Sequence, residues 1–599
     1  MDTSGKRRLF VLLMLLTAAI AALLVRLGSL QLLSSIGVRA AGADLVAQSV
    51  HQRERGLLLD SGRGQIVDRS LQPFTGGAIR ALAYFPVKPG SGALQERWKE
   101  LWRLLHTTER EWNRFTAGGG SQPRLWSGAD APRQPLELSA AEAERVRSLA
   151  LPGVEVLHVE QRYREPAPAG QVLGYVSEDP ERVRTEFADQ ISKGLLREDS
   201  LVGASGLEKQ FEHYLQGAGP TTVSLFTDGA KEPLPGLKVR LFQPGNPYYP
   251  TSLVTTLDRR LQVEVERLMD KAGIRSGAVV VLDASSSDIV AMASSPSFNP
   301  NQVDPQSGKW RNQALRAVAP GSVFKLVVAA AALEEKAVRP DEAFTCQGEL
   351  GRYGFSCWLR GGHGKLTMAE AFAQSCNLVF AQVMQRLDAG RLERYALRLG
   401  LAGLSGWSGD SLFGGETLRQ LDGEDKGQIF SSQADRTDSG LLIQTAIGQR
   451  DVLVSPLQAA QMINIILQGD QARAPRIVSE VRYANGMTMD RFPAQQAHRP
   501  AEGLSPQTVK TLKAWMRDVV VSGTGMALRN AKWPLAGKSG TAQTGAGAVH
   551  QWFAGYGPSD KPAYTVAVVV HDQPENGVNR ALPLFKEVMD LLASADGRQ

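Results

Sequence analysis

The sequence predicts an α+β fold with a largely antiparallel sheet, preceded by a mixed α/β half and one apolar N-terminal helix. Two apolar stretches, 277–283 and 289–293, are joined by a short polar turn and have the pattern of a β-hairpin. Several helix-like segments follow, and a run of short strand-like segments comes near the C-terminus. A strand pair, a series of helices and a final run of strands are typical of an α+β domain.

Length and composition exclude several classes of protein. The 599 residues suggest about three domains. With 43% hydrophobic and 21% charged residues, the chain is close to the globular average, which excludes collagen-like, disordered and disulfide-scaffold classes for most of it. A net charge of +6 over this length is too weak to indicate nucleic-acid binding.

One apolar segment at the N-terminus predicts a membrane anchor. The uninterrupted run from Leu9 to Val25 has 17 residues and follows three basic residues at positions 6–8. This length is at the short end of the ~17–25 residues that span hydrocarbon. Because basic residues favour the cytoplasmic side, we expect a cytoplasmic tail at 1–8, an anchor at 9–32 and an extracytoplasmic remainder. A cleaved signal peptide is the alternative, and it too exports the rest of the chain.

Residues 40–250 are mixed in character and rich in loops. Three tryptophans at roughly helix-like intervals between Leu94 and Phe115 predict one amphipathic helix. The pattern Ser139-Ala-Ala-Glu142 is a capping box and predicts the start of another helix. A stretch from Pro233 to Pro250, with five prolines and two glycines, has the composition of a linker and ends this half.

Residues 251–599 differ in their sequence pattern, because regular apolar segments follow one another closely. Helices are expected at Leu257–Ala272, Leu326–Leu333, Leu366–Leu387 and Pro456–Leu467. Besides the hairpin, strands are expected at Lys538–Thr544, Gln551–Tyr556 and Ala563–Val570.

Three cysteines are too few for a disulfide framework, and no Cys/His spacing resembles a zinc site. We therefore expect no metal site. Cys346 and Cys357 are compatible with a disulfide in an oxidising space or with two part-buried thiols, and the sequence does not decide between them. Cys376 remains single in either case.

A serine and a lysine, Ser322 and Lys325, follow Pro320-Gly321 and open an apolar helix. A serine needs an adjacent base to become a nucleophile, and a lysine with a lowered pKa can be that base. The N-terminus of a helix also offers free N–H groups to an oxyanion. Such a pair arises by chance about once in a chain of this length, so a capping serine and a surface lysine are the alternative.

Ser375 and Asn377 flank Cys376 within an otherwise apolar, alanine-rich stretch. Serine and asparagine compete with the backbone for hydrogen bonds inside a regular helix. They predict a turn between two helices that points a hydroxyl and an amide into a cleft. A polar patch that caps the following helix is the alternative.

The third motif, Lys538-Ser539-Gly540-Thr541, follows a glycine and opens a strand. Lys538 and Gly540 share one face of that strand, and a glycine allows close approach of a ligand or another backbone. A lysine with two hydroxyl residues forms an edge suited to a carboxylate. The alternative is a solvated strand end.

Together and in this order, the three motifs resemble those of penicillin-binding proteins and class A β-lactamases. The chain is similar to the transpeptidase domain of class B penicillin-binding proteins over roughly Thr251–Leu592. Its N-terminal half is similar to the family's elongated pedestal at Arg63–Arg69 and Gly206–Glu208. No motif of the class A glycosyltransferase half is found. The resemblance implies a pedestal, or dimerisation-like, domain at 40–250 and a penicillin-binding transpeptidase domain at 251–599, with helices flanking the sheet.

The resemblance also implies acyl transfer on peptidoglycan stem peptides that end in D-Ala-D-Ala. Ser322 would attack the penultimate carbonyl, a neutral Lys325 would accept its proton, and Ser375 would relay a proton to the leaving nitrogen. β-Lactams would acylate Ser322 and deacylate slowly. No metal or organic cofactor is needed for this chemistry.

The remaining motif residues would bind substrate. Asn377 would hold the substrate amide and Lys325. Lys538 would supply positive charge, and Ser539 and Thr541, on either side of Gly540, would bind the terminal carboxylate.

Two other functions remain as alternatives. With water as acceptor, the same site would make the chain a D,D-carboxypeptidase or a β-lactam hydrolase. A non-catalytic scaffold or β-lactam sensor is the second alternative, although both Ser322 and Lys325 are present. The resemblance further implies a polytopic glycosyltransferase as partner in the bacterial membrane, and no nucleic acid.

Overall fold

The structure, a computed structural model, forms two compact units. Met1–Ser61, Ala78–Glu160 and Pro220–Pro244 make up the first, and Gly62–Gly77, Gln161–Gly219 and Gly245–Gln599 make up the second. Two segments that precede residue 250 thus pack with the C-terminal part of the chain, and the functional boundary at residue 250 stays a prediction. The structure describes residues 3–32, 39–40, 43–44, 55–87, 94–118, 122–128, 134–193, 195–225, 240–351, 355–415, 417–431, 435–500, 502–545 and 547–595.

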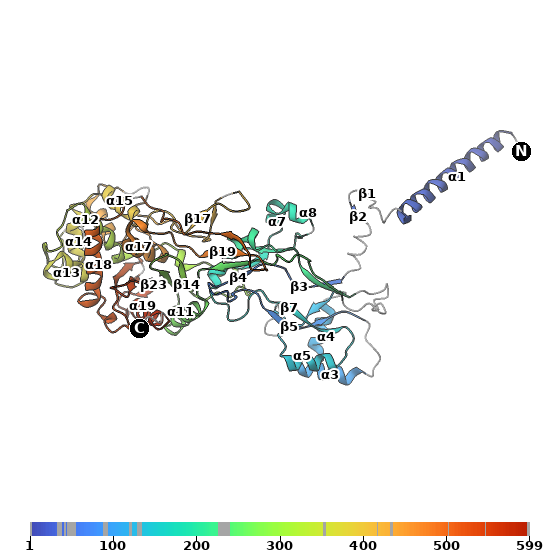
Figure 1. The fold of residues 1–599 in the computed structure, drawn as a ribbon, viewed down its shortest axis with the longest axis horizontal. Coiled ribbons are helices and arrows are strands. Elements are labelled where there is room, and N and C mark those ends of the chain that lie inside the picture. The colour runs from blue at the N-terminus through green and yellow to red at the C-terminus, as the bar shows by residue number, and fades with distance from the viewer. Residues whose placement is uncertain are drawn as a thin grey trace. The chain divides into compact units, whose positions relative to one another are not determined.

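The N-terminal segment is the long helix α1, Thr3–Leu32 (Figure 1). Its stretch Phe10–Leu27 has a mean hydropathy of 2.6, and none of it is buried. Among the described residues, this is the one helix long and apolar enough to cross a membrane. It is consistent with a single-pass membrane anchor.

In the first unit, strand β5 pairs antiparallel with β6 and β7, and helices α3, α4 and α5 accompany this sheet. Helix α5 begins at the predicted capping box, where Ser139 Oγ accepts a hydrogen bond from the Glu142 N–H at 3.2 Å. The bounds are β3 Arg55–Asp60, β5 Ala78–Tyr84, α3 Gln95–Leu104, α4 Glu109–Gly118, β6 Arg124–Leu125, α5 Ala140–Ser148, β7 Val154–Glu160, β10 Thr221–Leu225 and β11 Arg240–Phe242.

The single helix predicted between Leu94 and Phe115 is wrong, because the chain breaks there into α3 and α4. His106 adopts a left-handed φ of 50°. Thr108 and Glu111 then cap the second helix reciprocally, through Glu111 N–H to Thr108 Oγ1 at 3.3 Å and Thr108 N–H to Glu111 Oε2 at 3.0 Å. The predicted linker includes strand β11, and its first part, up to residue 239, lies outside the described residues.

In the second unit, the N-terminal segments form small elements around a buried ion cluster. Arg63 donates to Glu208 at 2.7 Å and to Glu212 at 2.7 Å, and Arg162 donates to Glu208 at 2.7 Å. Strand β4 runs parallel to β12 in a sheet of order β20-β19-β12-β4. The bounds are β4 Gln65–Val67, α6 Gly170–Leu173, β8 Val176–Glu178, α7 Pro180–Glu186, α8 Ala188–Ser192, β9 Leu201–Gly203, α9 Gly206–Gln210, α10 Glu212–Leu215, β12 Ser252–Thr255, β19 Val478–Arg482 and β20 Thr488–Arg491.

The main sheet has the order β14-β13-β23-β22-β21, and every neighbouring pair is antiparallel. The predicted hairpin and the three late strands are therefore confirmed, and they share one sheet. Helices α11 and α19 pack on each other and on the sheet, and α17 packs on its central strands. The bounds are α11 Arg259–Lys271, β13 Gly277–Asp283, β14 Ile289–Ser295, α17 Pro456–Gln468, β21 Ala536–Gln543, β22 Ala548–Gly557, β23 Tyr564–Pro574 and α19 Ala581–Ala595.

Helix α18 packs on strand β21 and on helices α12 and α13, and α12 in turn packs on α14 and α15. The single helix predicted at Leu366–Leu387 is wrong, since a strand and two helices, α13 and α14, occupy it. The turn predicted within it is confirmed at Ser375, whose φ is 55°. The bounds are 3₁₀ helix η5 Gly321–Phe324, α12 Lys325–Glu334, β15 Ala343–Cys346, β16 Gly364–Thr367, α13 Met368–Ala373, α14 Asn377–Met384, α15 Ala389–Arg398, β17 Ser408–Gly409, β18 Leu418–Arg419, α16 Ser439–Ala446 and α18 Pro506–Val521.

Candidate active site

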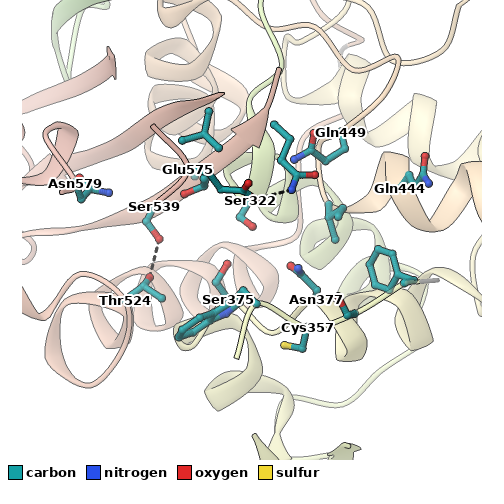
Figure 2. Close-up of a pocket in the computed structure, with 18 of the residues that line it drawn as sticks. Ser322, Cys357, Ser375, Asn377, Gln444, Gln449, Thr524, Ser539, Glu575 and Asn579 are labelled. Carbon is teal, nitrogen blue, oxygen red and sulfur yellow. Dashed lines mark hydrogen bonds between the residues drawn. The ribbon is translucent and has the colours of Figure 1, made fainter. Parts of the chain in front are cut away.

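The three sequence motifs meet at one cavity of about 910 Å³ (Figure 2). Six of the eight predicted site residues line it. The two lysines do not line it, because both are completely buried beside it, where they contact Ser375. The six lining residues are Ser322, Ser375, Asn377, Ser539, Gly540 and Thr541.

Ser322 is half-buried in the 3₁₀ turn η5, directly before helix α12. This turn lies against strand β21: a Cβ added to Gly321, which has φ 55°, would stand 2.3 Å from the Thr541 carbonyl oxygen. The Gly321 N–H donates to Gly448 O at 2.9 Å, and Trp552 Nε1 donates to Ala319 O at 3.0 Å. Backbone contacts on several sides therefore fix the serine next to the strand of the third motif.

Both buried lysines hydrogen-bond to the turn that carries Ser375. Lys325 Nζ donates to Asn377 Oδ1 at 2.7 Å and to Ser375 O at 2.8 Å, and it lies 3.3 Å from Ser375 Oγ. Lys538 Nζ donates to the same Ser375 Oγ at 2.9 Å and to Ser539 O at 3.1 Å. The Ser375 hydroxyl thus bridges the two amines.

Burial changes the protonation of these amines. It lowers the pKa of Lys325 to about 7, although the thiols of Cys376 and Cys357 oppose the change. Burial also lowers the pKa of Lys538 well below its usual range, and a charge on Lys325 lowers it further. Because two ammonium groups joined by one hydroxyl disfavour each other, a neutral amine is accessible in the pair at neutral pH.

None of the hydrogen bonds of the Lys325 amine within the described residues goes to Ser322. The amine nevertheless contacts Ser375 and Asn377, which line the same cavity as the serine. Catalytic hydrogen bonds are often long or unformed until a substrate is bound, so this geometry leaves Lys325 a candidate base for Ser322.

In the third motif, the structure gives Gly540 a packing role. A Cβ added to Gly540 would stand 2.5 Å from the Pro320 carbonyl oxygen, so this glycine lets η5 approach the strand. Ser539 is half-buried and exchanges a hydrogen bond of 2.6 Å with Thr524 Oγ1 (Figure 2). Thr541 is exposed to the cavity.

Sequence reasoning missed several residues of this cavity. Thr524 is one of them, and its position between Gly523 and Gly525 is the one local signal of a turn there. Trp358 also lines the cavity, and it comes from a loop that no local pattern marks.

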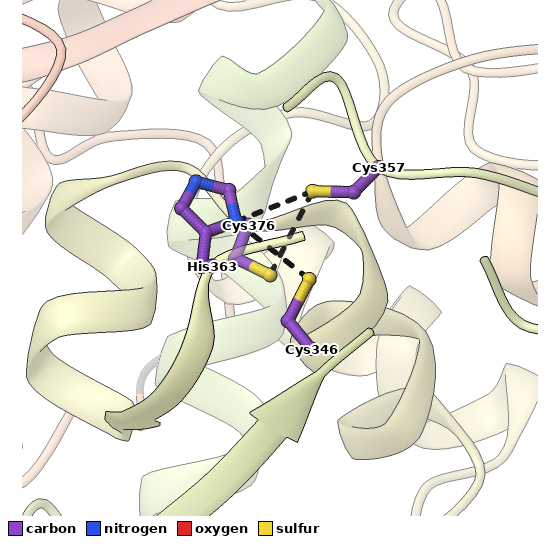
Figure 3. A group of neighbouring side chains, drawn as sticks. All are labelled: Cys346, Cys357, His363 and Cys376. Carbon is purple, nitrogen blue, oxygen red and sulfur yellow. Dashed lines mark hydrogen bonds between the residues drawn. The ribbon is translucent and has the colours of Figure 1, made fainter. Parts of the chain in front are cut away.

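All three cysteines are free thiols, and all are buried. The disulfide considered for Cys346 and Cys357 is therefore absent, and Cys376 is not isolated, since its sulfur lies 3.9 Å from that of Cys357. His363 joins them, so four side chains that can bind a metal lie together next to the turn of the second motif. Folding brings these residues together although their sequence spacing matches no common metal-binding pattern (Figure 3), and the expectation of no metal site stays a prediction.

Two family models match the chain. The penicillin binding protein transpeptidase domain matches residues 277–590, and the penicillin-binding protein dimerisation domain matches residues 59–231. With this pair of domains and the site described above, the chain belongs to the class B penicillin-binding proteins, which confirms the resemblance seen in the motifs.

Individual proteins are similar over most of the chain. Stage V sporulation protein D of Bacillus subtilis is 26% identical, over 98% of this chain and 85% of its own length. The peptidoglycan D,D-transpeptidase MrdA of Acinetobacter baumannii is also 26% identical, over 82% of this chain and 74% of its own.

Solved structures share the fold. A chain from a study titled as the structural coordination of polymerization and crosslinking by a peptidoglycan synthase complex gives a TM-score of 0.66 at 24% identity, over 99% of each chain. A chain from the complex between penicillin-binding protein PBP2 and MreC of Helicobacter pylori gives a TM-score of 0.62 at 20% identity, over 91% of this chain and 100% of that one.

Proposed function

We propose that the chain is a peptidoglycan D,D-transpeptidase that cross-links stem peptides through an acyl-enzyme on Ser322. The observation that carries the proposal is the buried Lys325 amine, hydrogen-bonded to Ser375 and Asn377 beside the cavity that Ser322 lines. Membership of the family and a relative named peptidoglycan D,D-transpeptidase MrdA support the same activity.

In the first step, Ser322 Oγ attacks the carbonyl carbon of the penultimate D-Ala, and the neutral Lys325 amine takes the hydroxyl proton. The N–H groups of Ser322 and Thr541 stabilise the resulting oxyanion, each by about 3 kcal/mol in comparable sites. The C–N bond then breaks, and the terminal D-Ala leaves as an amine that receives a proton through the Ser375 hydroxyl.

In the second step, an amine of a neighbouring stem peptide attacks the Ser322 ester. A new amide bond forms, the ester C–O bond breaks, and the proton of the amine returns to Ser322 through Lys325. The Ser375 hydroxyl is suited to relaying protons in both steps, because it contacts the amines of Lys325 and Lys538 at once.

The substrate carboxylate binds at the edge of β21. Ser539 and Thr541 offer hydroxyl donors, and Thr524 supports Ser539 through their shared hydrogen bond. The carboxylate charge favours protonation of Lys538, which leaves Lys325 as the neutral member of the pair. Asn377 holds Lys325 by accepting its hydrogen bond, and its side-chain amide also hydrogen-bonds to the backbone of the substrate peptide.

For the chain as a whole, we propose a cytoplasmic tail at 1–8, an anchor at 9–32, a pedestal at 40–250 and an extracytoplasmic catalytic domain at 251–599. The basic residues before the apolar run support this orientation. A polytopic glycosyltransferase is the proposed partner, in line with the peptidoglycan synthase complex from which one chain of similar fold comes.

A product assay tests the activity. The full-length chain is incubated with nascent peptidoglycan that carries D-Ala-D-Ala stems, and the muropeptides are separated by mass. We expect cross-linked dimers from the wild type and from Ser307→Ala, a control at an exposed serine outside the cavity, and none from Ser322→Ala. Trimmed monomers alone would indicate a carboxypeptidase, and the absence of any product would indicate a scaffold. Hydrolysis of penicillin in a parallel incubation would indicate a β-lactamase. Each of these results would overturn the proposal.

A further inference from the structure

The candidate cavity carries a carboxylate that the proposed reaction does not use. Glu575 lines the cavity from the loop after strand β23, and its side chain is exposed there (Figure 2). No other aspartate or glutamate lines the cavity in the described part of the chain. By contrast, Arg450 lines it, and the amines of Lys325 and Lys538 are buried beside it. The cavity therefore combines several basic groups with a single carboxylate.

This carboxylate is held in place by one oxygen only. Gln543 Nε2 donates to Glu575 Oε1 at 2.9 Å, and Glu575 makes no other hydrogen bond or ion pair within the described residues. The loop that carries it is fixed by the buried Gln551. Its Nε2 donates to Val578 O at 3.2 Å, and its Oε1 accepts the Arg580 N–H at 2.7 Å. Glu575 Oε2 is thus left open to a ligand in the cavity.

Strand β21 leads from the proposed carboxylate site to this group. It lies at the edge of the sheet, and its alternate residues Ser539, Thr541 and Gln543 line the cavity. Because residues 536–538 are buried, a peptide whose terminal carboxylate lies at Ser539 and Thr541 extends toward Gln543. Gln543 lies about 7 Å beyond Thr541 along the strand, which two extended residues cover. The residue before D-Ala-D-Ala therefore comes next to Gln543 and Glu575.

The chemistry of cross-linking supplies a cation for this position. In the proposed second step, an amine of a neighbouring stem peptide attacks the ester. Donor and acceptor stems belong to the same polymer, so a donor carries the same kind of amine until that amine is itself used. In water at neutral pH this amine is an ammonium group. A donor with a terminal carboxylate and an upstream ammonium complements the lysine side of the cavity and Glu575, respectively.

Charge also decides which of the two peptides Glu575 binds. The acceptor amine must be neutral to attack the ester, and a carboxylate beside it would keep it protonated. The amine of the donor must stay protonated, because as a neutral group it would compete with the acceptor for the ester on Ser322. A carboxylate at this place therefore suits the donor.

We propose that Glu575, positioned by Gln543, binds the side-chain ammonium of the donor stem peptide just upstream of D-Ala-D-Ala. It selects donors whose amine is still free over donors whose amine is acylated. The inference rests on the proposed transpeptidase function and adds the specificity of its donor site.

Acylation by two matched penicillins tests the assignment. The acyl side chain of a penicillin is attached where the upstream peptide of a donor would be, so one compound ends this chain in a primary amine and the other in its N-acetyl derivative. With the full-length chain in detergent at low salt, we expect Ser322 to be acylated about fivefold faster by the amine compound. This preference should shrink as salt is added, because Glu575 is exposed. Glu575→Gln should abolish it, and Glu575→Asp, which keeps the charge, should retain part of it.

Asp572→Asn is the matched control, since it removes one negative charge from a side chain that is 67% exposed and does not line the cavity. It should keep the wild-type preference. Equal rates with the two compounds in the wild type, a preference that survives in Glu575→Gln, or the same loss in Asp572→Asn would overturn the proposal. Failure of the proposed function is seen separately, as the absence of cross-linked dimers in the product assay. Acylation by neither penicillin would overturn both proposals.

Discussion

At the scale of single residues, the site depends on two lysines that have no carboxylate partner among the described residues. Each amine lies near the face of a phenylalanine, Lys325 at 5.2 Å from the Phe380 ring centre and Lys538 at 5.7 Å from that of Phe372. Such contacts stabilise a cation only weakly compared with a buried ion pair. Burial therefore dominates, and it favours the neutral amine that a base requires.

The first prediction concerns pH. Because burial lowers the pKa of Lys325 to about 7, the amine is protonated below that pH and cannot accept the Ser322 proton. The rate of acylation by a β-lactam should rise with pH through about 7 and level off above it. Burial is the main cause of this midpoint, and the cysteine side chains at 376 and 357 oppose it.

Stopped-flow acylation between about pH 5 and 9 measures this profile. Lys325→Arg is the control, since a guanidinium stays charged over this range and should abolish the rising limb together with most of the rate. A wild-type profile that is flat, or that falls as the pH rises, contradicts the assignment of Lys325 as base.

The second prediction concerns the buried carboxylate of Glu208. Although burial opposes ionisation, Arg162 and Arg63 lower the pKa of Glu208 to about 2. A lowered pKa stabilises the folded state above the ordinary pKa near 4.5, and this stabilisation is lost as the pH falls toward 2. Glu208→Gln should lower the melting temperature at neutral pH, by the equivalent of about 3–5 kcal/mol, and should flatten its dependence on acid.

Thermal unfolding of the full chain in detergent at several pH values checks this expectation. Glu144→Gln breaks an exposed ion pair on α5, where Glu144 is 76% exposed, and should change stability by less than about 0.5 kcal/mol. Equal effects of the two substitutions would contradict this prediction, because the buried ion cluster would then stabilise the fold no more than an exposed ion pair does.

At the scale of elements, the close approach of η5 to β21 places Ser322. Gly321→Ala should slow acylation by about a hundredfold, since the added methyl would meet the Thr541 carbonyl and push the serine away from the strand. Gly308→Ala is a matched control, with a similar φ of 64° but no atom within 4 Å of the added Cβ. The two variants should lose similar backbone stability, and only the first should lose acylation with penicillin. Similar acylation rates in both would contradict the role of this contact.

Much of the catalytic unit could be predicted from local patterns, because its strands are continuous apolar runs and several helices begin at capping residues. Leu366–Leu387 shows the limit, since apolar content suggested one helix where Ser375 takes a left-handed conformation between two. The prediction of one helix across α3 and α4 failed for a related reason. The helix-like spacing of the tryptophans drew attention away from a capping pair, Thr108 and Glu111, that begins the second helix.

The sequence predicted which residues form the site better than it predicted the contacts between them. The spacing identified Ser322 and Lys325, and the family resemblance supplied the contact of Lys325 with Asn377, 52 positions away. The contact of the same amine with Ser375, 50 positions away, came only from the structure. The cysteine cluster was missed for the same reason. Its four side chains come from the end of β15, the loop before β16 and the residue before α14, and they meet because β15 pairs with β16 and α14 packs against β15.

At the scale of the whole molecule, the retention or removal of α1 distinguishes an anchored enzyme from a secreted one. We expect the chain to stay in the membrane fraction after high-salt and carbonate washes, because the apolar stretch Phe10–Leu27 inserts in the bilayer. Mass spectrometry of the purified protein should find α1 still attached. Recovery of a shortened chain from the soluble fraction, beginning after α1, would show that the segment is a cleaved signal instead.

The central claim is that Ser322 carries the acyl group, and mapping the adduct tests it most directly. The full-length chain is labelled with a penicillin and digested, and the modified peptide is sequenced by tandem mass spectrometry. Our account predicts one adduct, on the Ser322 hydroxyl, absent from Ser322→Ala and present in Ser307→Ala. An adduct on another residue, or labelling that persists in Ser322→Ala, would contradict it.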